Sequence, residues 1–99
     1  MKASNKDGVT ALMRAAANGR PGVAQLLLNH GADVNVRDNK SVTALMYASG
    51  NGNAGVVELL LNKGADVNVN ANDGGTALMY ASGNGHAGVV ELLERHGAH

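Results

Sequence analysis

Apolar residues fall into two kinds of short run that alternate along the chain. The first kind begins at a threonine and continues with small apolar residues, as in TALMYA from Thr43 to Ala48. The second carries valine and leucine at i, i+3 and i+4, as between Val56 and Leu61, which is the spacing of one face of a helix. Asn51-Gly52 separates the two runs with residues suited to positive φ. The pattern therefore predicts pairs of short antiparallel helices.

Each pair is followed by a polar connection. Gly64 comes directly after the second apolar run, where a left-handed glycine commonly ends a helix. From Ala65 to Gly75 the chain is rich in Asn and Asp, and only Val67 and Val69 alternate as apolar residues. This composition predicts an extended, hairpin-like loop.

The whole pattern recurs every 33 residues. Thr-Ala-Leu-Met begins at Thr10, Thr43 and Thr76, and residues 43–60 and 76–93 differ at only one position, where Asn53 is replaced by His86. We expect a single domain over residues 1–99, with repeats at approximately 5–37, 38–70 and 71–99.

In period and motif the chain resembles the ankyrin repeats, which have a β-turn and two antiparallel helices in each 33-residue unit. The resemblance implies an all-α repeat solenoid that binds a protein partner through its hairpin tips and the concave inner-helix face. Two features differ from the family. Its usual proline is alanine at 11, 44 and 77, and its usual histidine is methionine at 13, 46 and 79. Methionine should retain the side-chain volume while it loosens the family's polar network.

Composition excludes several classes of function. Eight basic and eight acidic residues give no net charge, and the only aromatic side chains are Tyr47 and Tyr80, so we expect neither a nucleic-acid partner nor an aromatic cofactor pocket. The sequence has no apolar stretch long enough to span a membrane. The absence of cysteine fits the cytoplasm or another reducing compartment.

Candidate chemistry is better explained by the repeat itself. Residues 50–55 and 83–88 both match G-x-G-x-x-G, but a dinucleotide site needs a strand before the glycines, and here a helical run precedes them. His96 and His99 lack a nearby third metal ligand, and no serine lies in a nucleophile motif. We expect no catalysis, no cofactor and no metal.

The candidate binding residues lie where the repeat pattern is free to vary. They occupy the hairpin tips and the inner face of each first helix, and they are Asp7, Val9, Arg14, Asn18, Asn39, Lys40, Val42, Tyr47, Asn51, Asn72, Asp73, Tyr80 and Asn84. Tyr47 and Tyr80 are the strongest candidates, because exposed tyrosines are enriched among interface hot spots. The alternative is that both rings only pack against neighbouring helices.

Other interpretations remain open. The near identity of the last two repeats also fits an engineered or structural scaffold without a natural ligand, and a nucleotide-binding enzyme is a remote alternative. Glu94 and Arg95 give the last helix a partly charged end, whereas Val23, Leu26 and Leu27 have few such neighbours in the first repeat. We therefore expect a monomer, with end-to-end self-association as the alternative.

Overall fold

The computed structural model describes residues 8–98, and within this range the regular elements are six helices and no strand. Their bounds are α1 (Ala11–Ala17), α2 (Pro21–Asn29), α3 (Ala44–Gly50), α4 (Ala54–Asn62), α5 (Ala77–Gly83) and α6 (Ala87–Arg95). This is the all-helical repeat architecture that the apolar pattern predicts.

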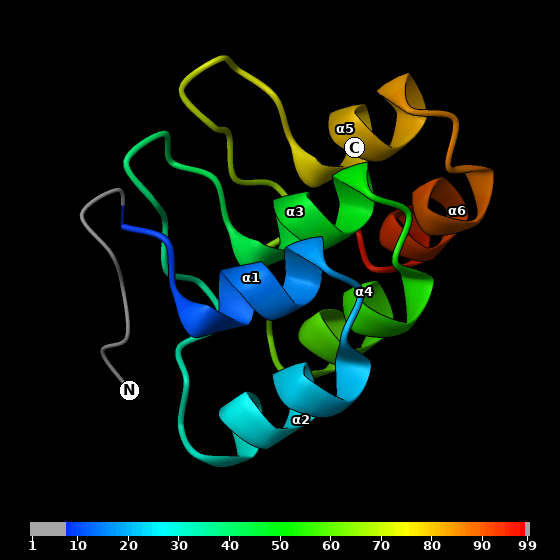
Figure 1. Ribbon diagram of the computed structural model, residues 1–99. Helices are drawn as coiled ribbons and strands as arrows, with labels where there is room; N and C mark the ends of the chain where they lie inside the picture. The colour runs from blue at the N-terminus through cyan, green and yellow to red at the C-terminus, as the bar shows by residue number, and fades with distance from the viewer. Residues whose placement is uncertain (1–7, 99) are drawn as a thin grey trace.

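The helices form two parallel rows (Figure 1). The seven-residue helices α1, α3 and α5 make the inner row, and the nine-residue helices α2, α4 and α6 make the outer row. Each helix packs against its own partner and against the same helix of the neighbouring repeat. The polar loops all leave the inner row on the same side, so their tips lie next to one another.

Local sequence signals set the helix boundaries. The hydroxyls of Thr10, Thr43 and Thr76 accept hydrogen bonds of 3.2–3.3 Å from the backbone N–H three residues later, and this caps each inner helix. Gly52 (φ 73°) makes the tight turn between α3 and α4, and Gly64 (φ 89°) follows the end of α4. Both conformations favour glycine.

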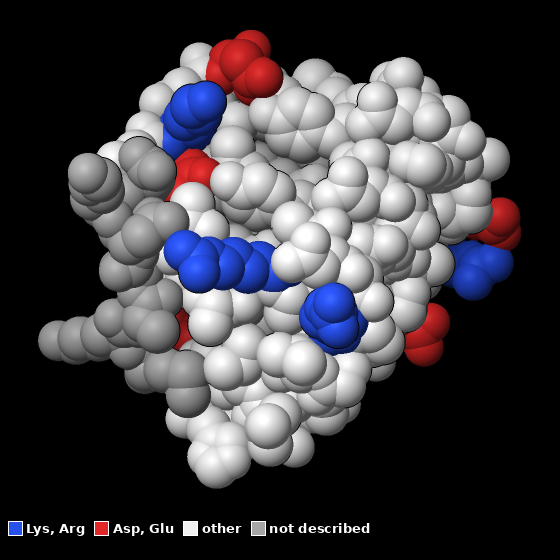
Figure 2. Space-filling model, in the orientation of Figure 1, with Lys and Arg blue, Asp and Glu red and all other residues white. Residues whose placement is uncertain are grey.

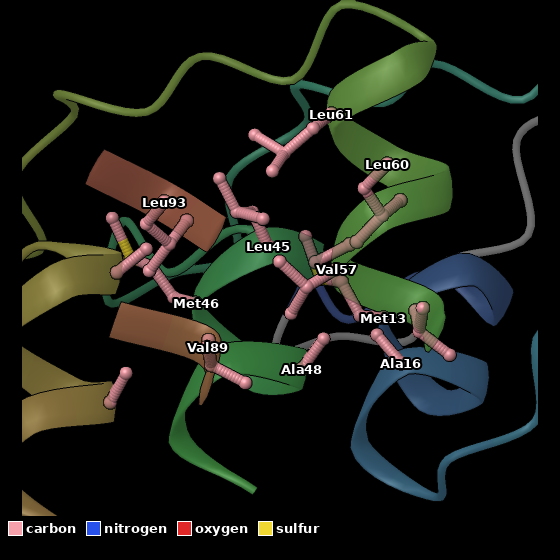
Figure 3. Packing of buried hydrophobic residues seen from close by; sticks show 14 of the residues in the cluster. Met13, Ala16, Leu45, Met46, Ala48, Val57, Leu60, Leu61, Val89 and Leu93 are labelled. Atoms are coloured by element: carbon pink, nitrogen blue, oxygen red, sulfur yellow. The ribbon is translucent and has the colours of Figure 1, made fainter. Parts of the chain in front are cut away.

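The core lies between the rows and between successive repeats (Figure 3). Met13, Leu45, Leu60 and Leu93 are among its fully buried side chains. Methionine retains its volume in the core of the first two repeats, but Met79 is 55% exposed. Met79 is exposed because no later helix among the described residues covers it, so the methionine of the last repeat contributes little to the core.

The loops have the predicted hairpin character without forming strands. A backbone hydrogen bond of 3.0 Å joins Asp38 N–H to Val42 C=O, and one of 2.8 Å joins Ala71 N–H to Gly75 C=O. Asn72 N–H also donates to Lys40 C=O at 2.9 Å. The first two bonds hold the tips of the second and third repeats closed, and the last one joins the third tip to the second.

Candidate partner-binding surface

The inner helices and the hairpin tips form one continuous surface. Figure 2 shows that most of the area over α3 and α5 carries neither acidic nor basic side chains. Arg14 is exposed on α1, and Asn18 is exposed at the end of that helix. Of the candidate residues, Asp7 lies outside the described residues.

Two of the repeats share a groove on this surface. It has a volume of about 230 Å³ and is lined by the predicted residues Val42, Tyr47, Asn51, Tyr80 and Asn84, together with Met46 and Gly50. Both tyrosines are half-buried. The structure thus brings five candidate residues from repeats two and three together.

A second hollow lies beside the groove at the hairpin tips. It has a volume of about 300 Å³ and is lined by Val9, Asp38, Asn39, Lys40 and Tyr47. Tyr47 lines both hollows, which makes it the central side chain of the surface.

Each tyrosine is anchored by a carboxylate of its own hairpin. Tyr47 donates its hydroxyl to Asp38 Oδ2 at 2.5 Å, and Tyr80 donates to Asp73 Oδ1 at 2.8 Å. Burial and the bond to Asp73 raise the pKa of Tyr80 to about 12. The hydrogen bonds from Gly75 N–H and from Tyr80 in turn lower the pKa of Asp73. The rings are therefore held in fixed positions with their hydroxyls already paired.

Asp38 also lines this surface, although it is not among the residues proposed from the sequence. The residue as a whole is only 9% exposed, and its carboxylate accepts bonds from Lys40 N–H and Val42 N–H, both 2.9 Å, as well as from Tyr47. Burial opposes ionisation, but these three bonds outweigh it and lower the pKa of Asp38. The signal in the sequence was an Asp within a polar loop, because an Asp side chain in such a place commonly accepts a bond from the backbone N–H two residues later, as in an Asx-turn.

The asparagines of the candidate set connect neighbouring repeats. Asn51 Nδ2 donates to Ala17 C=O at 3.0 Å, and Asn84 Nδ2 donates to Gly50 C=O at 2.8 Å. At the tips, Asn72 Nδ2 donates to Asn39 C=O at 3.3 Å. All of these side chains line the surface, but their amide donors already hold the solenoid together.

The glycine-rich segments lie at turns between helices. Residues 50–55 run from the last residue of α3 to the second residue of α4, and residues 83–88 run in the same way from α5 to α6, so a helix and not a strand precedes each turn. The His86 side chain of the next repeat packs directly against Gly52, because a Cβ there would come within 2.6 Å of the His86 ring. The motifs therefore serve interhelical turns and close packing between repeats.

The serines of the two later inner helices differ in exposure, and the metal-binding residue types form no cluster within residues 8–98. Ser49 is fully buried and Ser82 is exposed. No group of three or more His, Cys, Asp or Glu side chains in that range is placed to hold a metal ion. Among the same residues, no helix has the length and apolar character needed to cross a membrane.

Comparison with known families agrees with this geometry. A model described as ankyrin repeats in three copies matches residues 37–99, and a single ankyrin-repeat model matches residues 7–39. No curated protein matches the chain. Ankyrin repeats are generally protein–protein interaction modules. The capped helix pairs, the 33-residue period and these matches lead to one conclusion: the chain belongs to the ankyrin-repeat family.

Proposed function

We propose that the chain is a non-catalytic module that binds a protein partner through its hairpin tips and inner-helix face. The observation that carries the proposal is the groove between Tyr47 and Tyr80, because both rings are held half-exposed by carboxylates on the same surface. Rigid amphipathic rings contribute contact area with little loss of conformational entropy on binding.

The lining of the groove indicates what part of a partner would enter it. Val42 and the tyrosine rings supply apolar surface, and Asn51 and Asn84 supply a polar margin. An apolar centre within a polar rim is the usual arrangement of a protein interface. We infer that an apolar side chain of the partner lies between the two rings.

The proposal treats residues 1–99 as one binding unit of three repeats, at approximately 5–37, 38–70 and 71–99. It assigns the unit to the cytoplasm or another reducing compartment, because a cysteine-free solenoid takes no stability from disulfides.

The test is a binding comparison on immobilised protein. Cell-extract proteins retained by the unchanged chain are compared with those retained by a Tyr47→Ala, Tyr80→Ala double variant and by Lys63→Ala, a control at an exposed outer-row position. We expect a partner retained by the unchanged chain and the control but lost with the double variant, whose helicity is checked by circular dichroism. Equal retention by all three proteins would contradict the proposed site, because binding would not depend on the tyrosines. No retained protein at all would favour a scaffold without a natural ligand.

A further inference from the structure

The two ends of the solenoid carry the exposed large apolar side chains of the described residues. Val23 and Leu26 on α2 are 47% and 58% exposed, and Met79 on α5 is 55% exposed. The equivalent valines of the later repeats, Val56 and Val89, are buried. Within residues 8–98, therefore, no repeat covers these end positions in the way that the same position is covered inside the molecule.

The two ends match each other through the repeat. Met46, Ser49 and Val57 are buried in the second repeat, whereas their equivalents Met79, Ser82 and Val90 are exposed or half-exposed in the third. These residues therefore form the face that covers the next repeat. Conversely, Val23 and Leu26 belong to the face that a preceding repeat covers. The last repeat thus presents a docking face, and the first repeat presents the surface that such a face covers.

A side chain in each repeat also fits onto a glycine of the preceding one. A Cβ at Gly19 would lie within 2.9 Å of the Asn53 side chain, and a Cβ at Gly52 would lie within 2.6 Å of the His86 ring. Arg20 of the first repeat is the equivalent of Asn53 and His86. No described repeat precedes it, so the matching glycine would be Gly85 in the last repeat of a second molecule. The space around Gly85 is open.

Charge favours the same pairing. Gly85 lines a hollow of about 480 Å³ together with Glu91 and Glu94. Arg95 pairs with Glu91 at 2.6 Å, and Glu94 has no ion-pair partner within residues 8–98. An arginine seated on Gly85 would therefore lie beside acidic side chains.

The overall charge of the two ends is also opposite. Residues 8–37 contain three basic residues and one acidic residue, whereas residues 71–98 contain three acidic residues and one basic residue. Association of a positive end with a negative end is electrostatically favourable, and association of two like ends is not.

We propose that a second copy of this chain docks head to tail, with the Met79 face of one molecule on the Val23–Leu26 face of the next and Arg20 in the hollow at Gly85. Such a contact uses two different surfaces, so it leaves a free end at each side and builds open arrays. The inner-helix groove would continue from one molecule to the next. The arrays dissociate to monomers on dilution.

Two variants block one end each. Leu26→Glu and Met79→Glu place an acidic group on exposed positions, so both should keep the unfolding midpoint that the unchanged chain has at high dilution, where it is monomeric. Asn62→Glu adds the same charge to an exposed position of the middle repeat and serves as the control. Sedimentation is measured over about a hundredfold range of protein concentration, because mass action makes association concentration-dependent.

The mixing result decides the geometry. We expect the unchanged chain and Asn62→Glu to grow in mass with concentration, Leu26→Glu and Met79→Glu to stay monomeric alone, and their equimolar mixture to form a dimer and nothing larger. A constant monomer mass for the unchanged chain would overturn the proposal. So would self-association of either blocked variant, which would indicate pairing of like ends.

Salt and Arg20 test the electrostatic part. Raising the salt from about 0.05 M to about 0.5 M should weaken the association constant by about threefold or more, because exposed charges are screened over shorter distances. Arg20→Gln should weaken it at low salt and reduce this salt dependence. An association that is unchanged in both experiments would remove Arg20 from the interface.

Discussion

Tyr80 donates its hydroxyl to Asp73 across 2.8 Å, although the equivalent Tyr47 uses Asp38 at a different position of its hairpin. The repeats explain the difference, because the position of Asp38 holds Ala71 in the third repeat and the position of Asp73 holds Lys40 in the second. The absence of a side chain at Gly75 also leaves room for the Tyr80 ring, since a Cβ there would lie 2.7 Å from that ring. Each ring therefore pairs with a carboxylate that its own tip supplies.

The Tyr80–Asp73 bond predicts an alkaline titration. In Tyr47→Phe, Tyr80 is the only remaining tyrosine, so tyrosinate absorbance reports on it alone. We expect a midpoint near 12 instead of the ordinary 10, because burial and Asp73 both disfavour the phenolate. Addition of Asp73→Asn should lower this midpoint, with circular dichroism as the check that the helices persist. A midpoint near 10 with Asp73 intact would contradict the bond.

The direction of the linked stability change follows from the raised pKa. The folded state holds the Tyr80 proton more tightly than the unfolded state, so this contribution to the free energy of unfolding is complete below pH 10. It is lost as the pH rises through about 12. Tyr80→Phe, which cannot ionise, should remove this part of the alkaline loss in chemical unfolding measurements.

The sequence predicts the fold well because fold signals are local and repeated. Thr43 before an apolar run and Gly64 after one fix the two ends of a helix pair, and the 33-residue period transfers both assignments to the other repeats. The tyrosine–carboxylate pairs are less accessible to sequence reasoning. Asp38 and Asp73 hold different positions in their repeats, so no single spacing identifies both, and the pairing depends on where each ring lies.

Ser49 predicts a stabilising substitution. Its side chain is fully buried, and its hydroxyl oxygen has no hydrogen-bond partner among the described residues. Burial of an unpaired polar group is costly, so Ser49→Ala should raise the free energy of unfolding by about 1 kcal/mol. Ala16 holds the same position in the first repeat and is equally buried.

Ser82→Ala is the matched control, because Ser82 is exposed in an otherwise identical helix. The free energy of unfolding of Ser82→Ala should rise only by the difference in helix propensity between serine and alanine, about half a kcal/mol or less. Urea unfolding of both variants gives the comparison. An equal gain would show that burial of the Ser49 hydroxyl carries no penalty.

Two neighbouring glycines predict opposite effects of the same substitution. A Cβ at Gly83 or at Gly85 would meet nothing within 4 Å, but Gly85 has φ +76° and Gly83 is the last residue of α5. Gly83→Ala should therefore stabilise by about 0.5–1 kcal/mol, and Gly85→Ala should destabilise by about 1 kcal/mol. Thermal melting of both variants checks the signs, and a gain at Gly85 would contradict its left-handed conformation.

The binding surface also shows why a repeat pattern does not assign roles. Asn51 and Asn84 hold a position that is asparagine in every repeat, and they line the groove. Their amides nevertheless bond to the carbonyls of Ala17 and Gly50 in the preceding repeat. A contact between repeats depends on the stacking distance, and the sequence of one repeat does not contain that distance. The exposure of Met79 has the same origin, since its chemistry is that of the buried Met46 and only its place at the end differs.

The helices of the first repeat contact those of the third chiefly through the middle repeat. A pulling force applied between α2 and α6 would therefore pass chiefly through α3 and α4. A partner that binds both Tyr47 and Tyr80 would stiffen the contact between the second and third repeats and leave the contact between the first and second repeats unchanged. Resistance to stretching would then differ along the length of the bound molecule.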